Sequence, residues 1–126
     1  MKINEIENNI AHIASDVFSK IKNTLELRFE SGAATCTVAA LELGRAFNKH
    51  NIPFNVISGD YANGGHYWIE SNNAIYDLGN NLTHHALDTG RISPIITNVS
   101  DTKYKREDVM SFDEYEHLFN TELKKY

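Results

Sequence analysis

The sequence is short of several residue types, and each shortage excludes a class of protein. A single cysteine in 126 residues cannot form an internal disulfide, so nothing indicates an oxidising compartment. No run approaches the roughly 20 apolar residues of a membrane-spanning helix, and the start of the chain lacks the apolar stretch of a signal peptide. We therefore predict a cytoplasmic protein without a membrane partner, and leave export by a signal-independent route open.

Positive charge is also in the minority, with 12 Lys and Arg against 17 Asp and Glu and a net charge of -5. A protein that binds nucleic acid regardless of sequence needs a basic face, so we predict no nucleic-acid partner. The chain has only two prolines, no low-complexity segment and no internal repeat, and it therefore shows no linker. Its length of 126 residues predicts one domain, residues 1–126, with a core of its own.

Three segments have the pattern of helices. Apolar residues recur every three or four positions near the N-terminus, which predicts an amphipathic helix that ends before Leu27. A second helix, residues 36–50, follows Thr35 as its N-cap and cannot continue through Pro53. A third begins after Ser111, because Glu114 completes a capping-box pattern there. The apolar positions of the first helix are Ile3, Ile6, Ile10, Ile13, Val17, Ile21 and Leu25.

The middle of the chain favours short strands. Segments 53–58, 66–70 and 74–78 are rich in β-branched and aromatic residues, and turn-forming residues separate them. They predict an antiparallel meander, with its first turn spread over residues 59–65.

The remaining segments are less regular. Residues 92–99 can hold a further strand, interrupted near Pro94, whereas residues 79–90 read as an irregular polar loop and 101–108 as a charged connection. Together the segments predict an α+β fold. In it a central helix that carries Cys36 packs on an antiparallel sheet, flanked by N- and C-terminal helices.

A histidine and an aspartate fall on one face of the predicted second hairpin. If Ser71 and Asn72 form a two-residue loop, His66 lies opposite Asp77, because side chains alternate with period two along each strand. A register two residues different leaves the pair diagonal and still within hydrogen-bond reach after side-chain adjustment. This pattern by itself is common in hairpins.

The cysteine adds a nucleophile to this pair. Cys36 begins a predicted helix, where unpaired N–H groups and the helix dipole favour a thiolate. His66 can then act as the base and Asp77 can orient its ring, which is the division of roles in a catalytic triad. The first-turn N–H groups can also stabilise an oxyanion on a substrate carbonyl.

These segments resemble the transglutaminase-like core of the papain-like cysteine enzymes. Members of that family show a Cys-bearing helix, then a strand like Ile52–Gly59, then "H-x-W-x-E" as in His66–Glu70, then "Y-D-x" as in Tyr76–Leu78. The resemblance covers roughly residues 33–80.

The resemblance implies an α+β papain-like fold and thiol-dependent acyl transfer or amide hydrolysis on a protein or peptide amide, without a cofactor or metal. By position it makes Cys36 the nucleophile, His66 the base and Asp77 the orienting residue. The chain has no glutamine, the side-chain oxyanion donor of papain-type enzymes, so a backbone N–H or an asparagine such as Asn23 has to substitute.

Two other interpretations stay open. The same fold can act without turnover, as a binding module for protein partners. Alternatively, His66, His84 and His85 can be read as metal ligands, although no tight ligand spacing supports this. Trp68 is expected to pack in the core, with a possible second role in shielding the His–Asp pair, and Glu70 to be a solvated residue at a strand end.

Overall fold

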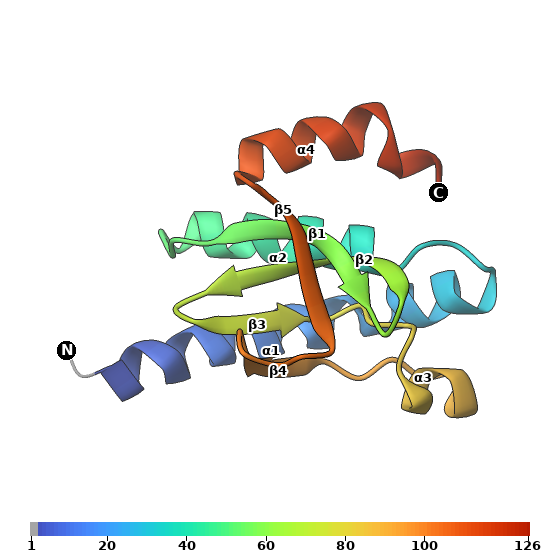
Figure 1. The fold of residues 1–126 in the computed structure, drawn as a ribbon, viewed down its shortest axis with the longest axis horizontal. Coiled ribbons are helices and arrows are strands. Elements are labelled where there is room, and N and C mark those ends of the chain that lie inside the picture. Colours follow the sequence, from blue (N-terminus) through green and yellow to red (C-terminus); the bar gives the residue numbers. More distant parts are fainter. Residues whose placement is uncertain (1–2) are drawn as a thin grey trace.

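The computed structural model describes residues 3–126, with side chains from Asn8 onward, and over this range it shows an α+β fold (Figure 1). Its sheet has five antiparallel strands in the order β4-β3-β2-β1-β5. The elements are α1 (Ile3–Glu30), α2 (Cys36–Lys49), β1 (Asn55–Tyr61), β2 (Gly64–Ser71), β3 (Ala74–Asp77), α3 (His84–Thr89), β4 (Ile95–Asn98), β5 (Tyr104–Met110), α4 (Phe112–Thr121) and the short 3-10 helix η1 (Leu123–Lys125).

The three predicted helices form, but the first is longer than its sequence pattern indicated. Of its predicted apolar positions, Ile10, Ile13, Val17 and Leu25 are buried, while Ile3 and Ile6 lie outside the described side chains. The prediction that α1 ends before Leu27 was wrong. The helix continues to Glu30 and stops at Gly32, whose φ of +78° is a left-handed conformation that glycine adopts without strain.

The predicted meander of β1, β2 and β3 is confirmed, but its turns are tighter than the sequence indicated. Ala62–Asn63 and Asn72–Asn73 each form a two-residue turn in which both residues have positive φ, as hairpins with right-handed twist require. The predicted loop over residues 59–65 was therefore wrong. Gly59 lies within β1, and Gly64 begins β2.

One strand and one α-helix were not predicted. The expected charged connection contains β5, which pairs with the free edge of β1 and turns only Tyr104 fully inward. The expected polar loop contains α3, which Thr83 caps and Gly90 ends, but its six residues are too few to show a period. The further strand predicted within residues 92–99 is present as β4.

The sheet has a hydrophobic core on each face. On one face α1, α2 and α4 cover residues such as Val56, Ile69 and Tyr76. On the other face lies a second core cluster, which consists of Ile57, Tyr61, Trp68, Ile75 and Tyr104, with Leu82, Ile95 and Val99 packed against it. Neighbouring residues along a strand alternate between the two cores, as the period of a strand requires.

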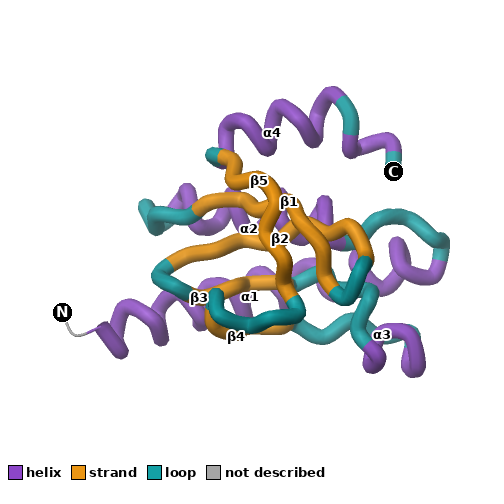
Figure 2. Tube along the Cα trace, in the orientation of Figure 1, coloured by secondary structure: helices purple, strands orange, loops and turns teal. Residues whose placement is uncertain are grey.

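The sheet is strongly curled around this second cluster, and β5 crosses in front of the other strands (Figures 1 and 2). In the strand order, β5 and β3 are three positions apart, which in a flat sheet is about 14 Å at about 4.8 Å per strand. The Tyr104 hydroxyl nevertheless donates a hydrogen bond to Asp77 Oδ2 over 2.7 Å. An irregular register between β1 and β5 at Ser58 and Gly59 adds to the bend.

Candidate active site

Cys36 is the first residue of α2 and is partly exposed, and it lies where backbone N–H groups lack helical partners. Thr35 occupies the N-cap position as predicted, but its side chain makes no capping bond. Its hydroxyl instead donates a 2.6 Å bond to the carbonyl of Gly79. The side chain of Thr35 therefore leaves the first-turn N–H groups beside Cys36 uncapped.

The bond from Thr35 to Gly79 joins the start of α2 to the segment that follows β3. A Cβ built on Gly79 would lie 2.7 Å from the carbonyl oxygen of Thr35 and 2.7 Å from the Cβ of Ala39, so only glycine fits here without a shift. Because Gly79 is two residues after Asp77 and Thr35 directly precedes Cys36, this close contact brings the carboxylate and the thiol to the same end of the sheet.

This contact gives a first testable prediction. Gly79→Ala is expected to lower the free energy of unfolding by about 1–3 kcal/mol, because the added methyl group forces the segment after β3 away from α2. Urea unfolding measures the loss. Gly65→Ala is the matched control, since a Cβ there has no neighbour within 4 Å. Equal stability of the two variants would contradict the close approach.

His66 and Asp77 form a buried pair. His66 Nε2 lies 2.8 Å from both Oδ1 and Oδ2 of Asp77, and each side chain is 1% exposed. The hairpin register with His66 directly opposite Asp77 was wrong, because Ser71 pairs with Ala74 and the loop is Asn72–Asn73. The diagonal register, two residues away, is the one that forms.

Two further residues hold the carboxylate of Asp77. Asn80 Nδ2 donates to Asp77 Oδ2 over 2.8 Å, and the Tyr104 hydroxyl donates to the same oxygen. Together with His66, the buried carboxylate thus has three hydrogen-bond donors, which compensate the cost of removing its charge from water. Neither contact could be predicted from the sequence, since Tyr104 lies in a charged stretch and Asn80 in an apparent loop.

The charge state of His66 follows from its neighbours. Burial alone would lower its pKa, but the charge and hydrogen bond of Asp77, aided by Cys36, raise it to about 10. The ring is thus a cation at neutral pH. Its Nε2 faces Asp77, while Nδ1 is buried without a hydrogen-bond partner among the described residues.

The thiol of Cys36 is the group that can interact with the unpartnered Nδ1 of His66. Cys36 is close enough to raise the pKa of His66 through its charge and a hydrogen-bonding contribution, although its geometry falls short of a formed hydrogen bond. Within the described part of the chain, the two buried side-chain polar atoms without a partner are His66 Nδ1 and Thr37 Oγ1. His66 Nδ1 belongs to the ring whose pKa Cys36 raises, and Thr37 directly follows Cys36 in the sequence. Buried polar atoms without a partner are typical of a functional site.

Two tyrosines border Cys36 on the helical side of the sheet. The Tyr115 hydroxyl donates a 2.7 Å bond to the carbonyl of Thr37, and the Tyr67 ring packs on the Tyr115 ring with centroids 5.4 Å apart. Burial raises the pKa of both phenols, and the charge of Cys36 raises it further. Both therefore stay neutral at physiological pH.

Trp68 and Glu70 lie on β2, the strand that also carries His66. Trp68 is buried in the second core cluster as predicted, with its indole ring 6.1 Å from the His66 ring and inclined by 30°. Glu70 is not the solvated strand-end residue that we predicted. It accepts hydrogen bonds from Trp68 Nε1 and from Arg106, and its side chain is only 13% exposed.

The other candidate residues lie apart from this pair. His84 is exposed and pairs with Asp88, and the side chains that the structure describes include no group of three or more His, Cys, Asp or Glu that could hold a metal ion. Asn23, the predicted alternative oxyanion donor, is exposed and lines a groove whose walls include none of Cys36, His66 and Asp77. This leaves the first-turn N–H groups of α2 as the candidate donors.

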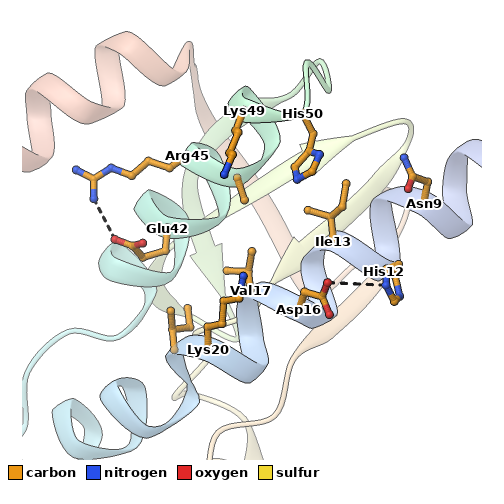
Figure 3. A pocket seen from close by; sticks show the side chains of 12 residues that line it. Asn9, His12, Ile13, Asp16, Val17, Lys20, Glu42, Arg45, Lys49 and His50 are labelled. Carbon is orange, nitrogen blue, oxygen red and sulfur yellow. Dashed lines mark hydrogen bonds and ion pairs between the residues drawn. The ribbon is translucent and has the colours of Figure 1, made fainter.

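A groove between α1 and α2, about 460 Å³ in volume, is also separate from this site (Figure 3). Ile13 and Val17 are among its apolar lining residues. Two pairs of its lining residues interact along the helices, His12 with Asp16 and Arg45 with Glu42. Its lining includes neither Cys36 nor His66.

No protein-family model, curated protein or solved structure matches the chain. Among the described residues, no helix is both long and apolar enough to cross a membrane.

Proposed function

We propose that the chain is a thiol-dependent acyltransferase or amide hydrolase with a transglutaminase-like, papain-like arrangement of Cys36, His66 and Asp77. The observation that carries the proposal is the buried His66–Asp77 pair with its unpartnered Nδ1 next to a cysteine at a helix N-terminus. An imidazolium there favours the thiolate, and a partly exposed thiolate is a nucleophile.

The proposed reaction proceeds in two steps. Cys36 Sγ attacks the carbonyl carbon of a protein or peptide amide, and first-turn N–H groups of α2 bind the oxyanion. The C–N bond then breaks as His66 gives its Nδ1 proton to the leaving amine, which yields a thioester. In the second step, water or another amine attacks the thioester while His66 takes up the proton, and the Cys36 thiolate and the imidazolium are restored.

Asp77 acts on the thiol through His66. Its carboxylate fixes Nε2 as the nitrogen that faces away from Cys36, so Nδ1 is the atom that exchanges protons with substrate. It also stabilises the positive charge of the ring in the resting state. Water access at Cys36 decides whether hydrolysis, deamidation or crosslinking dominates.

An activated ester tests the proposal without knowledge of the natural substrate. With p-nitrophenyl acetate, we expect a rapid release of nitrophenol in proportion to the protein, followed by slower turnover as the thioester hydrolyses. The Cys36→Ser variant should show neither phase above the rate of the ester in buffer. If wild type and this variant release nitrophenol alike, the chain is a binding module with a papain-like fold and not an enzyme of this type.

A further inference from the structure

We infer that Tyr104 is a positioning residue for the His66–Asp77 pair, and that its hydroxyl, together with the amide of Asn80, fixes the orientation of the Asp77 carboxylate. The consequence for Cys36 rests on the function proposed above. The contact itself and its effect on His66 do not depend on that function.

The hydrogen bonds to Asp77 are distributed unevenly between its two oxygens. Oδ2 accepts from His66, Asn80 and Tyr104 at 2.8, 2.8 and 2.7 Å, whereas Oδ1 accepts from His66 at 2.8 Å. The two additional donors therefore act on one oxygen and prevent rotation of the carboxylate about its Cβ–Cγ bond. In this orientation both oxygens face His66 Nε2.

Tyr104 is itself held rigidly. The residue is 8% exposed, and its ring packs against Tyr61, with centroids 4.8 Å apart, and against Trp68 at 5.0 Å and an angle of 73°. Burial, and then the charge of Asp77, raise the pKa of the phenol, so it remains a donor throughout the physiological range. Asn80 is also fully buried, and its Oδ1 accepts from the N–H of Leu82.

The position of Tyr104 in the fold makes this contact sensitive to the shape of the sheet. Tyr104 comes from β5 at one edge, and Asp77 ends β3, which is three positions away in the strand order. The contact exists only because the sheet curls around the second core cluster. A change that flattens the sheet at β5 would withdraw the hydroxyl and free the carboxylate to turn.

Tyr104→Phe tests the inference, with Tyr61→Phe as its control. Tyr61 belongs to the same aromatic cluster and is equally buried, but its hydroxyl makes no hydrogen bond to Asp77. Proton NMR of the His66 Nε2–H reports how well the pair is held. We expect this resonance to be sharp in wild type and in Tyr61→Phe, and broadened or lost through exchange with water in Tyr104→Phe.

Alkylation of Cys36 by iodoacetamide at about pH 6 gives the second readout. Tyr104→Phe is expected to slow this alkylation by about tenfold relative to Tyr61→Phe, because the ring of His66 is less well oriented.

A merely structural role of Tyr104 would lower the stability of both variants and leave both readouts unchanged. If the His66 resonance is equally sharp in both variants, the inference is overturned. If wild type shows no fast alkylation, the proposed function fails, while the NMR comparison still decides the role of Tyr104. Should Tyr104→Phe not fold, Asn80→Ala removes the other donor and is expected to broaden the same resonance, and an unchanged resonance there overturns the inference too.

Discussion

Iodoacetamide is expected to alkylate Cys36 of the wild-type protein at nearly the same rate from about pH 5.5 to about pH 7.5. An ordinary thiol, with a pKa of about 8.5, would instead react about tenfold faster for each pH unit in this range. The proposed function predicts this difference because His66, whose pKa is raised to about 10, is a cation throughout and would favour the Cys36 thiolate. The rate then no longer depends on removal of a proton by the solvent.

The size of the effect is greatest at low pH. At about pH 5.5 an ordinary thiol is only about 0.1% thiolate. A stabilised thiolate is less nucleophilic, which offsets part of this advantage. We therefore expect wild type to react at least about tenfold faster than His66→Gln at this pH.

His66→Gln is chosen because it removes the charge while keeping a polar side chain near Asp77. Circular dichroism and the NMR spectrum of each protein confirm that both are folded during the measurement. A wild-type rate that rises tenfold per pH unit, parallel to that of His66→Gln, would contradict the assignment of Cys36 as a nucleophile activated by His66.

The stability of the protein is expected to fall at alkaline pH, and His66 is the cause. Its pKa is about 10 in the folded chain against 6.5 for the unperturbed side chain, so the folded state holds the proton more tightly. The stabilisation is therefore fully present below about pH 6.5 and is lost as the pH rises through about 10. Between about pH 7 and 9.5 the loss is on the order of 3 kcal/mol, at 1.36 kcal/mol per unit of pKa.

Urea unfolding of wild type and His66→Gln at these two pH values measures this loss of stability. The difference between the proteins isolates His66, because the other titrating groups are common to both. The upper limit stays below the pKa of about 10 of an unperturbed tyrosine, so the phenols whose pKa burial raises, those of Tyr61, Tyr67, Tyr104 and Tyr115, ionise little in this range. The wild type should lose the additional stability, and equal losses in both proteins would show that the buried ion pair does not form.

The sequence was sufficient for the parts of the fold that repeat a pattern or use a defined cap. Ser111 and Glu114 form the predicted capping box, in which the Ser111 hydroxyl and the Glu114 carboxylate each accept a backbone N–H. The meander was predictable because β-branched and aromatic residues alternate with asparagine-rich turns. The helix of Cys36 was predictable from its cap position and from the proline that follows it.

The rest depends on contacts between distant segments, which no local pattern reveals. The segment of β5 looked like a charged surface connection because six of its seven residues are not buried. Its one buried residue, Tyr104, reaches the site only because the sheet curls. The predicted end of α1 before Leu27 was wrong because the helix continues through Leu27, whose side chain is exposed and adds nothing to the apolar stripe.

The candidate site, too, was only partly predictable from local patterns. Cys36, His66 and Asp77 could be proposed from residue type and position in each element, and the structure places His66 and Asp77 in contact. The sequence did not indicate how the helix and the hairpin meet. The answer is the close contact between Thr35 and Gly79, which uses a hydroxyl that the sequence assigned to a helix cap.

The location of an acetyl group after brief treatment with p-nitrophenyl acetate tests the central claim most directly. Peptide mapping by mass spectrometry of wild type and His66→Gln identifies the residue that becomes acylated. The proposed function predicts rapid acetylation of Cys36 in wild type, much slower acetylation in the variant, and loss of the group from wild type as the thioester hydrolyses. Acetyl groups found only on surface lysines, at equal rates in both proteins, would contradict it.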